Sequence, residues 1–170
     1  RHTYDPKDIG RMEYKYNEVA RKRGINVPDY KLLDGKYFAS KRFDIENGKR
    51  LHIATAGALL NESISNPKLD YKVLLHLTGY LTQDSQQVDE MFQRMVFNVL
   101  TDNKDDHVKN FSFICREGKW SLAPAYDLTL CKEGYHGEHA TSANNKGNPD
   151  IEDMLAVGES IRIPRRKGME

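Results

Sequence analysis

The stretch "TDNKDDHVKN", residues 101–110, places three aspartates, two lysines, a histidine and two asparagines in ten positions. It follows the clearest helical pattern of the chain, residues 85–100, whose broad apolar stripe predicts a helix buried in the core. Two short strand-like runs, "FSFIC" and "WSLA", come next and flank a Glu117-Gly118 turn. A polar stretch between a buried helix and a hairpin is either a solvated connection or a loop that carries chemistry.

The spacing of the polar residues in this stretch is that of a phosphotransfer loop. Transfer of phosphate from ATP requires one carboxylate for the acceptor hydroxyl, and an amide oxygen and a second carboxylate for magnesium. Asp105 and Asn110 have the Asp-x-x-x-x-Asn spacing of protein kinases, and Asp127 follows the hairpin, where the third ligand is expected. Oxygen ligands of this kind suit magnesium, and Lys109 would neutralise the transferred phosphate. Spacing alone leaves a structural loop as an equal alternative.

The remaining patterns indicate an α+β protein that is mostly helical. Helical spacing of apolar residues predicts further helices over residues 12–20, 55–60 and 71–81. Asp34-Gly35 predicts a two-residue turn between strands at 30–33 and 36–43. A loop is expected over 132–149, followed by a helix with Pro149 at its first position. Local hairpins among helices favour this class over a parallel sheet.

Composition is typical of a soluble globular domain, with 38% hydrophobic and 30% charged residues in a chain of 170. A net charge of +1 predicts neither nucleic-acid nor membrane binding, and basic clusters at 20–24 and 162–168 are interpreted as solvated. Cys115 and Cys131 are expected to be reduced thiols, which indicates the cytoplasm. The polar start at Arg1 leads us to expect a piece of a longer protein.

Several segments resemble the HipA family of bacterial serine/threonine kinase toxins. The most specific are "DDHVKNFSFI" (105–114) and "WSLAPAYDLT" (120–129). Residues 24–44, from "GINVPDYKLL" to "YFASKRFD", are similar to the segment that leads through the interlobe hinge, and "GEHATSANNKGNP" (137–149) is also similar. The resemblance implies that residues 45–170 form a helical, kinase-like C-terminal lobe that contains the catalytic loop. Residues 1–44 would be the hinge and a small hairpin remnant of the N-terminal lobe.

The resemblance implies roles for the residues of the loop. Asp105 would be the catalytic base, and Asn110 and Asp127 would bind Mg²⁺. Lys109 and His107 belong to the same motif, and His107 would brace the loop through hydrogen bonds.

The resemblance also implies roles for residues that would bind ATP. Backbone groups of Lys41 and Phe43 would meet adenine, and Asp44 would reach the ribose. Glu13, in "MEYKY", matches the helical glutamate that pairs with a phosphate-binding lysine.

The chain departs from the family pattern before Glu13, where the sequence has neither a glycine-rich phosphate loop nor a strand lysine. A fragment, a lobe supplied by another polypeptide and a degenerate protein are all compatible with this departure. A lobe that keeps Asp105, Asn110 and Asp127 but lacks the phosphate-binding lid is expected to bind ATP poorly. The resemblance implies a protein substrate with a serine or threonine hydroxyl, a DNA-binding antitoxin partner and a role in growth arrest or persistence. The alternatives are a non-catalytic interaction or regulatory module and a small-molecule phosphotransferase.

Overall fold

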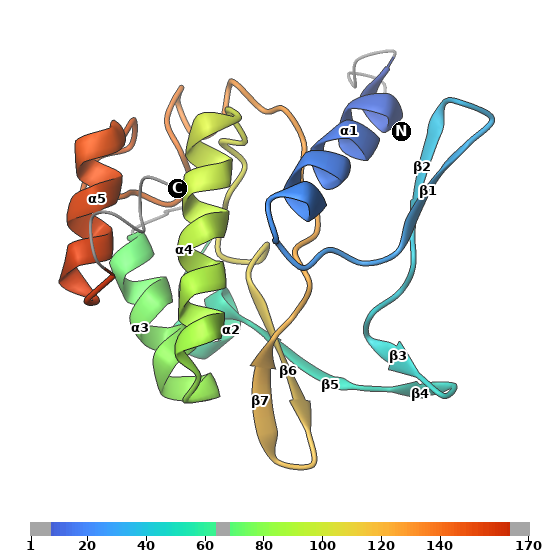
Figure 1. Ribbon diagram of the computed structural model, residues 1–170, viewed down its shortest axis with the longest axis horizontal. Helices are drawn as coiled ribbons and strands as arrows, with labels where there is room; N and C mark the ends of the chain where they lie inside the picture. Colours follow the sequence, from blue (N-terminus) through green and yellow to red (C-terminus); the bar gives the residue numbers. More distant parts are fainter. Residues whose placement is uncertain (1–7, 64–68, 164–170) are drawn as a thin grey trace.

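Two adjacent helices, α3 (Tyr71–Thr82) and α4 (Ser85–Leu100), form the centre of the structure, a computed structural model that describes residues 8–63 and 69–163 (Figure 1). Asp70 caps α3 by accepting a hydrogen bond from the Lys72 amide at 2.9 Å, and Asp84 caps α4 in the same way. Gln83, in the left-handed region at φ 51°, ends α3 and allows the sharp reversal into α4. Both helices appear where apolar spacing predicted them.

The main core lies between these helices, a sheet and the last helix. Its largest fully buried side chains come from α3, α4 and the strand that follows the polar loop, and include Tyr71, Leu74, Leu75, Met91, Met95 and Phe113. Helix α5 (Ile151–Ser160) packs against both α3 and α4 (Figure 1). The buried stripe of α4 therefore leads directly into the polar loop at its C-terminal end.

After that loop the chain continues into a three-stranded antiparallel sheet. It has the order β5 (His52–Thr55), β6 (Ser112–Arg116) and β7 (Lys119–Leu122), with Thr55 opposite Ser112 and Cys115 opposite Trp120. The β6–β7 hairpin is the predicted one, but β5 was not predicted, because its partner lies far away in the sequence. Thr55 ends β5 and caps the short helix α2 (Ala56–Leu60), accepting a hydrogen bond from the Ala58 amide at 3.1 Å.

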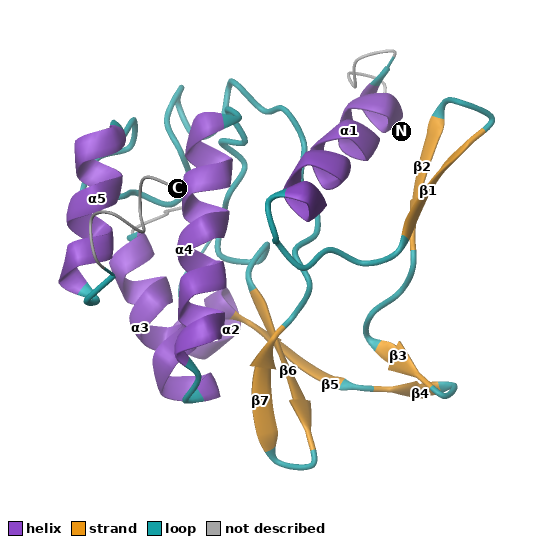
Figure 2. Cartoon of the chain, in the orientation of Figure 1, coloured by secondary structure: helices purple, strands orange, loops and turns teal. Residues whose placement is uncertain are grey.

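The first part of the chain forms helix α1 (Ile9–Lys22) and two small hairpins, β1 (Tyr30–Leu33) with β2 (Tyr37–Ser40) and β3 (Ile45–Glu46) with β4 (Lys49–Arg50). Leu33 pairs with Tyr37, so three residues form the first turn, and the predicted two-residue turn is wrong by one position. At Gly10 of α1 a Cβ atom would lie 2.3 Å from the Lys36 carbonyl oxygen, so this close approach of α1 to the hairpin requires glycine. Figure 2 shows these strands apart from the group of α3, α4 and α5.

Helix α5 begins two residues later than predicted, at Ile151 and not at Pro149. Its N-cap is Asp150, whose carboxylate accepts from the Asp153 amide while Asp153 accepts from the Asp150 amide, both at 3.0 Å. This capping box satisfies the first turn, so Pro149 stays outside the helix.

The α+β class with a mostly helical core is confirmed. None of the helices among the described residues is long and apolar enough to cross a membrane. Most of the basic cluster at 162–168 lies outside the described residues. The division at residue 44 stays a prediction.

Candidate active site

The loop between α4 and β6 is fixed to the rest of the fold by backbone hydrogen bonds. Val108 and Phe111 accept from the amides of Gly57 and Ala56 of α2, at 3.1 and 2.8 Å. Within the loop, the Asn110 side-chain amide donates to the Asp105 carbonyl oxygen at 2.8 Å. Asp105 and Asn110 are thereby held in a defined relation to each other.

Asp105 lies at the surface of this loop with its side chain 53% exposed. Its Oδ1 atom lies 3.8 Å from His107 Nε2. Partial burial raises the pKa of Asp105, the nearby His107 lowers it, and the negative charges of Asp127 and Asp106 raise it further. A carboxylate with a raised pKa is a stronger base than an ordinary aspartate, which suits proton abstraction.

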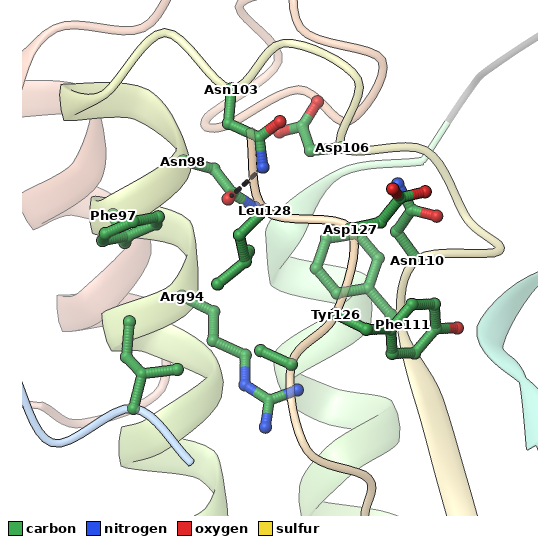
Figure 3. Close-up of a pocket in the computed structure, with 12 residues that line it drawn as sticks. Arg94, Phe97, Asn98, Asn103, Asp106, Asn110, Phe111, Tyr126, Asp127 and Leu128 are labelled. Carbon is green, nitrogen blue, oxygen red and sulfur yellow. Dashed lines mark hydrogen bonds between the residues drawn. The ribbon is translucent and has the colours of Figure 1, made fainter. Parts of the chain in front are cut away.

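Asp127 and Asn110 line one pocket, and Figure 3 shows their side chains next to each other. Asp127 has a left-handed backbone at φ 58°, an uncommon conformation for a residue other than glycine, and such conformations concentrate at functional sites. Asn110 and Asp127 therefore lie in one pocket, and Asp105, which does not line it, is close enough to Asp127 for the two charges to interact.

The donor set of this group fits a magnesium ion that also has phosphate ligands. Because the Asn110 amide nitrogen is bonded to the loop, its Oδ1 atom is the group left for a cation, beside the Asp127 carboxylate. Within residues 8–63 and 69–163, no group of three or more His, Cys, Asp or Glu side chains is arranged to hold a metal. Magnesium is commonly bound by only one or two carboxylates together with substrate phosphates, so two protein ligands are compatible with it.

Tyr126 connects the predicted hinge to this site and was not predicted to belong to it. Its ring lies against that of Phe43, with 5.4 Å between centroids. Its hydroxyl group bonds with Ser112 Oγ at 2.6 Å and donates to the Lys109 carbonyl oxygen. Burial foremost raises the pKa of Tyr126, so the hydroxyl stays a donor at neutral pH. Its position directly before Asp127 was the available signal.

Two predicted nucleotide contacts already have protein partners. The Lys41 amide donates to the Asp29 carbonyl oxygen at 2.7 Å, which leaves its carbonyl group as the backbone atom for a ligand. Asp44 accepts two hydrogen bonds from the Arg42 guanidinium group, which lowers the pKa of Asp44. Asp44 would therefore have to bond to the ribose while it also bonds to Arg42.

Glu13 and Lys109 lie outside the pocket that Asn110 and Asp127 line. Glu13 is on α1, a helix that packs against β1 and β2, and it does not line the pocket of Asp127. Lys109 is exposed on the loop, and its carbonyl oxygen is bonded to Tyr126.

Unsatisfied polar atoms also gather here. Among the described residues, the buried side-chain atoms without a hydrogen-bond partner are Asn103 Oδ1, His107 Nδ1 and Thr129 Oγ1. All three lie in the two segments that carry Asp105 and Asp127, and buried polar atoms of this kind are few in native structures.

Asp106 is a second residue that the sequence analysis did not single out. It is fully buried and bonded to Tyr71, His139 and Thr141. Two successive aspartates in a loop were the available signal, because adjacent side chains there can face opposite environments. His139 is one of its partners.

The family described as "HipA-like C-terminal domain" matches residues 3–169. The chain belongs to the HipA-like C-terminal domain family. The resemblance seen in the sequence motifs is thereby confirmed.

Similar proteins include one named as a putative kinase and two solved structures. A protein of Sinorhizobium fredii (strain NBRC 101917 / NGR234) named "Putative kinase Y4dM" is 28% identical over 150 residues, which cover 78% of this chain and 36% of the relative. HipA of Shewanella oneidensis MR-1, solved with HipB and operator DNA, superposes with a TM-score of 0.79 at 20% identity over 99% of this chain and 46% of its own. The proinflammatory kinase CtkA of Helicobacter pylori gives 0.64 at 16% identity, over 96% and 74%.

At these identities the two structures show a common fold with this HipA-like domain and no more. The chain spans about a third of Y4dM and under half of the Shewanella HipA chain. The kinase-like fold that the resemblance implied is confirmed, while the roles of individual residues stay predictions.

Proposed function

We propose that this HipA-like domain is the C-terminal lobe of a serine/threonine protein kinase, which transfers the γ-phosphate of ATP to a hydroxyl group. The observation that carries the proposal is the convergence of Asp105, Asn110 and Asp127 from two separated segments on one place. Kinase names among the relatives support the class of reaction.

In the proposed reaction, Asp105 orients the acceptor hydroxyl and takes its proton as phosphate transfer proceeds. Asn110 Oδ1 and the Asp127 carboxylate hold Mg²⁺, which neutralises charge on the phosphates when it is bound. Lys109 extends from the same loop and adds a positive charge near the transferred group. His107 stabilises the carboxylate of Asp105 from 3.8 Å away.

Adenine would bind at the hinge. The Lys41 carbonyl group accepts from adenine and the Phe43 amide donates to it, while Asp44 bonds to the ribose. The ring contact of Phe43 with Tyr126 supports this arrangement, because it links the hinge to the residue before Asp127. Glu13 would pair with a phosphate-binding lysine in the other lobe of the kinase.

We further propose a cytoplasmic toxin that causes growth arrest or persistence and is restrained by a DNA-binding antitoxin. The support is the Shewanella HipA structure, which contains HipB and operator DNA. DNA contact would belong to the antitoxin, since this chain has a net charge of only +1.

The test uses the full-length protein that carries this domain, with calorimetry of Mg-ATP binding and transfer of labelled phosphate. Asp105→Asn should lower transfer by about a hundredfold or more, the usual value of a general base, with ATP affinity nearly unchanged. Asp127→Asn should weaken nucleotide binding only when Mg²⁺ is present. Asp102→Asn, three residues before Asp105 in the same loop, is the matched control.

Full transfer activity in Asp105→Asn would remove this residue from the mechanism. An absence of Mg-ATP binding, together with tight binding to a protein partner, would favour the non-catalytic interaction module. Phosphoamino-acid analysis distinguishes the third case, because a small-molecule phosphotransferase would leave serine and threonine unmodified.

A further inference from the structure

The loop that carries Asp105 is held from inside the protein by its neighbour, Asp106. We propose that Asp106 is a positioning residue, which sets the orientation of Asp105 by tying the loop to α3 and to residues 139–141. This inference rests on the proposed kinase function and adds a device that prepares its site.

The carboxylate of Asp106 has a complete set of donors. It accepts hydrogen bonds from Tyr71 Oη at 2.7 Å, His139 Nδ1 at 3.0 Å and the Thr141 amide at 3.2 Å. Its side chain is 0% exposed, and a buried carboxylate is tolerated only with such partners. Thr141 Oγ1 also donates to the Asp106 carbonyl oxygen at 2.5 Å, so backbone and side chain are both fixed.

The hydrogen-bond chain continues from Tyr71 back to the start of the same loop. Since the Tyr71 hydroxyl donates to Asp106, its oxygen accepts from Asn98 Nδ2 at 2.9 Å. Asn98 Oδ1 then accepts from Asn103 Nδ2 at 2.9 Å (Figure 3). Residues 103 and 106 are thus joined to each other through α3 and α4.

The segment after Asp127 is bonded along the other side of the loop. Lys104 donates its amide to the Cys131 carbonyl oxygen at 3.0 Å and accepts from the Ala140 amide at 3.2 Å. The Cys131 amide donates to Asp102 at 3.0 Å, and Lys104 Nζ donates to the Gly137 carbonyl oxygen at 2.8 Å. His139 and Thr141 therefore reach Asp106 from a segment that is itself seated on residues 102–104.

Asp105 depends on this support because its own side chain is half exposed and lies 3.8 Å from His107. The direction in which the Asp105 side chain points is set by the backbone between Lys104 and Asp106. A displacement of about 1 Å in a reacting group can lower the rate by about a hundredfold. Loss of the hydrogen bonds to Asp106 should therefore lower kcat.

The experiment removes the donors to Asp106 one at a time in the full-length protein. Tyr71→Phe and His139→Ala should each lower kcat by about tenfold to a hundredfold, while the KM for ATP stays within about twofold. His139→Asn, which keeps a donor near the position of Nδ1, should recover most of the loss. Tyr80→Phe and His76→Ala, both exposed on α3, are the matched controls.

Amide hydrogen exchange gives a readout that does not depend on catalysis. Residues 104–110 should exchange faster in Tyr71→Phe and His139→Ala, while β6 and β7 stay protected. If the wild type neither binds Mg-ATP nor transfers phosphate, the kinase proposal fails, and exchange still decides whether Asp106 holds the loop. Unchanged exchange would overturn the positioning role, as would a rise in KM that parallels the fall in kcat.

Discussion

Asp105 and Asp106 are adjacent in the chain and have opposite surroundings. Asp105 is half exposed beside a second carboxylate, whereas Asp106 is enclosed by three donors. Folding therefore disfavours the charge of Asp105 and accommodates that of Asp106. An active site commonly gains reactivity at the expense of stability in this way.

This difference predicts that Asp105→Asn stabilises the protein at neutral pH. The pKa of Asp105 is raised in the folded state, so the cost of its charge is present above that raised pKa and absent below the ordinary value of about 3.9. Solvent screens the half-exposed group, and we expect a gain in melting temperature of about 1–2 °C at pH 7. Thermal melts at pH 7 and pH 3 measure it, and a lower melting temperature in the variant at pH 7 would contradict the argument.

Spacing predicted Asp105, Asn110 and Asp127 because the motif is linear and short. Asp106 and Tyr126 were not predicted as part of the site, and the reason is physical. A loop has no fixed period, so the sequence does not tell which of two neighbouring side chains faces inward. Only their partners from α3, β6 and residues 139–141 define their places.

At the scale of an element, the carboxylate of Asp153 connects helix α5 to the loop that precedes it. Asp153 lies in the capping box and also accepts from Asn144 Nδ2 at 3.0 Å and from Lys146 Nζ at 2.8 Å. The Asn144 and Lys146 bonds, followed by the amide of Asp150, hold the pKa of Asp153 well below its usual range. The helix and the loop before it are thereby joined.

We predict that Asp153→Asn lowers the melting temperature at pH 7 by about 3 °C, as for the loss of a helix cap. Because the folded pKa is depressed, the stabilisation is present above the ordinary carboxyl pKa of about 3.9 and disappears as pH falls toward the folded value. The gap between wild type and variant should therefore narrow below pH 4. A gap between the two melting temperatures that is as large at pH 3 as at pH 7 would contradict this role of Asp153.

Elements with local signals were predictable, and those with distant partners were not. Helices α3 and α4 and the β6–β7 hairpin follow from periodicity and from turn residues at positive φ, such as Glu117 and Gly118. Strand β5 has four residues and no turn to mark it, and it exists because β6 offers an edge. Such a strand is specified by tertiary pairing.

At the scale of the molecule, two clusters of apolar side chains are linked through α4. The smaller cluster joins α1 and the segment before β1 to the stretch around Asp127, and it contains Ala20, Ile25, Val27, Phe97, Ala125 and Leu128. Phe97 also meets the ring of Tyr16 edge-on, with 5.9 Å between centroids. Helix α4 thus carries one cluster on each of two sides.

Phe97→Ala should accordingly loosen α1 as well as destabilise the whole chain. We expect a loss of about 3–5 kcal/mol in the free energy of unfolding, because a buried aromatic ring is removed and leaves a cavity. Urea denaturation measures it, and hydrogen exchange should rise most in α1. Tyr80→Ala, at an 80% exposed position, should change stability by less than about 0.5 kcal/mol.

The pairing of β5 with β6 has a kinetic consequence. Residues 52–55 meet 112–115 only after the intervening chain has closed a long loop, and closure of this kind is slow compared with forming local helices and turns. The α3–α4 pair should therefore assemble early and shorten the remaining search, with β5 docking late. A nascent chain would then acquire its helical scaffold well before it completes the proposed nucleotide site.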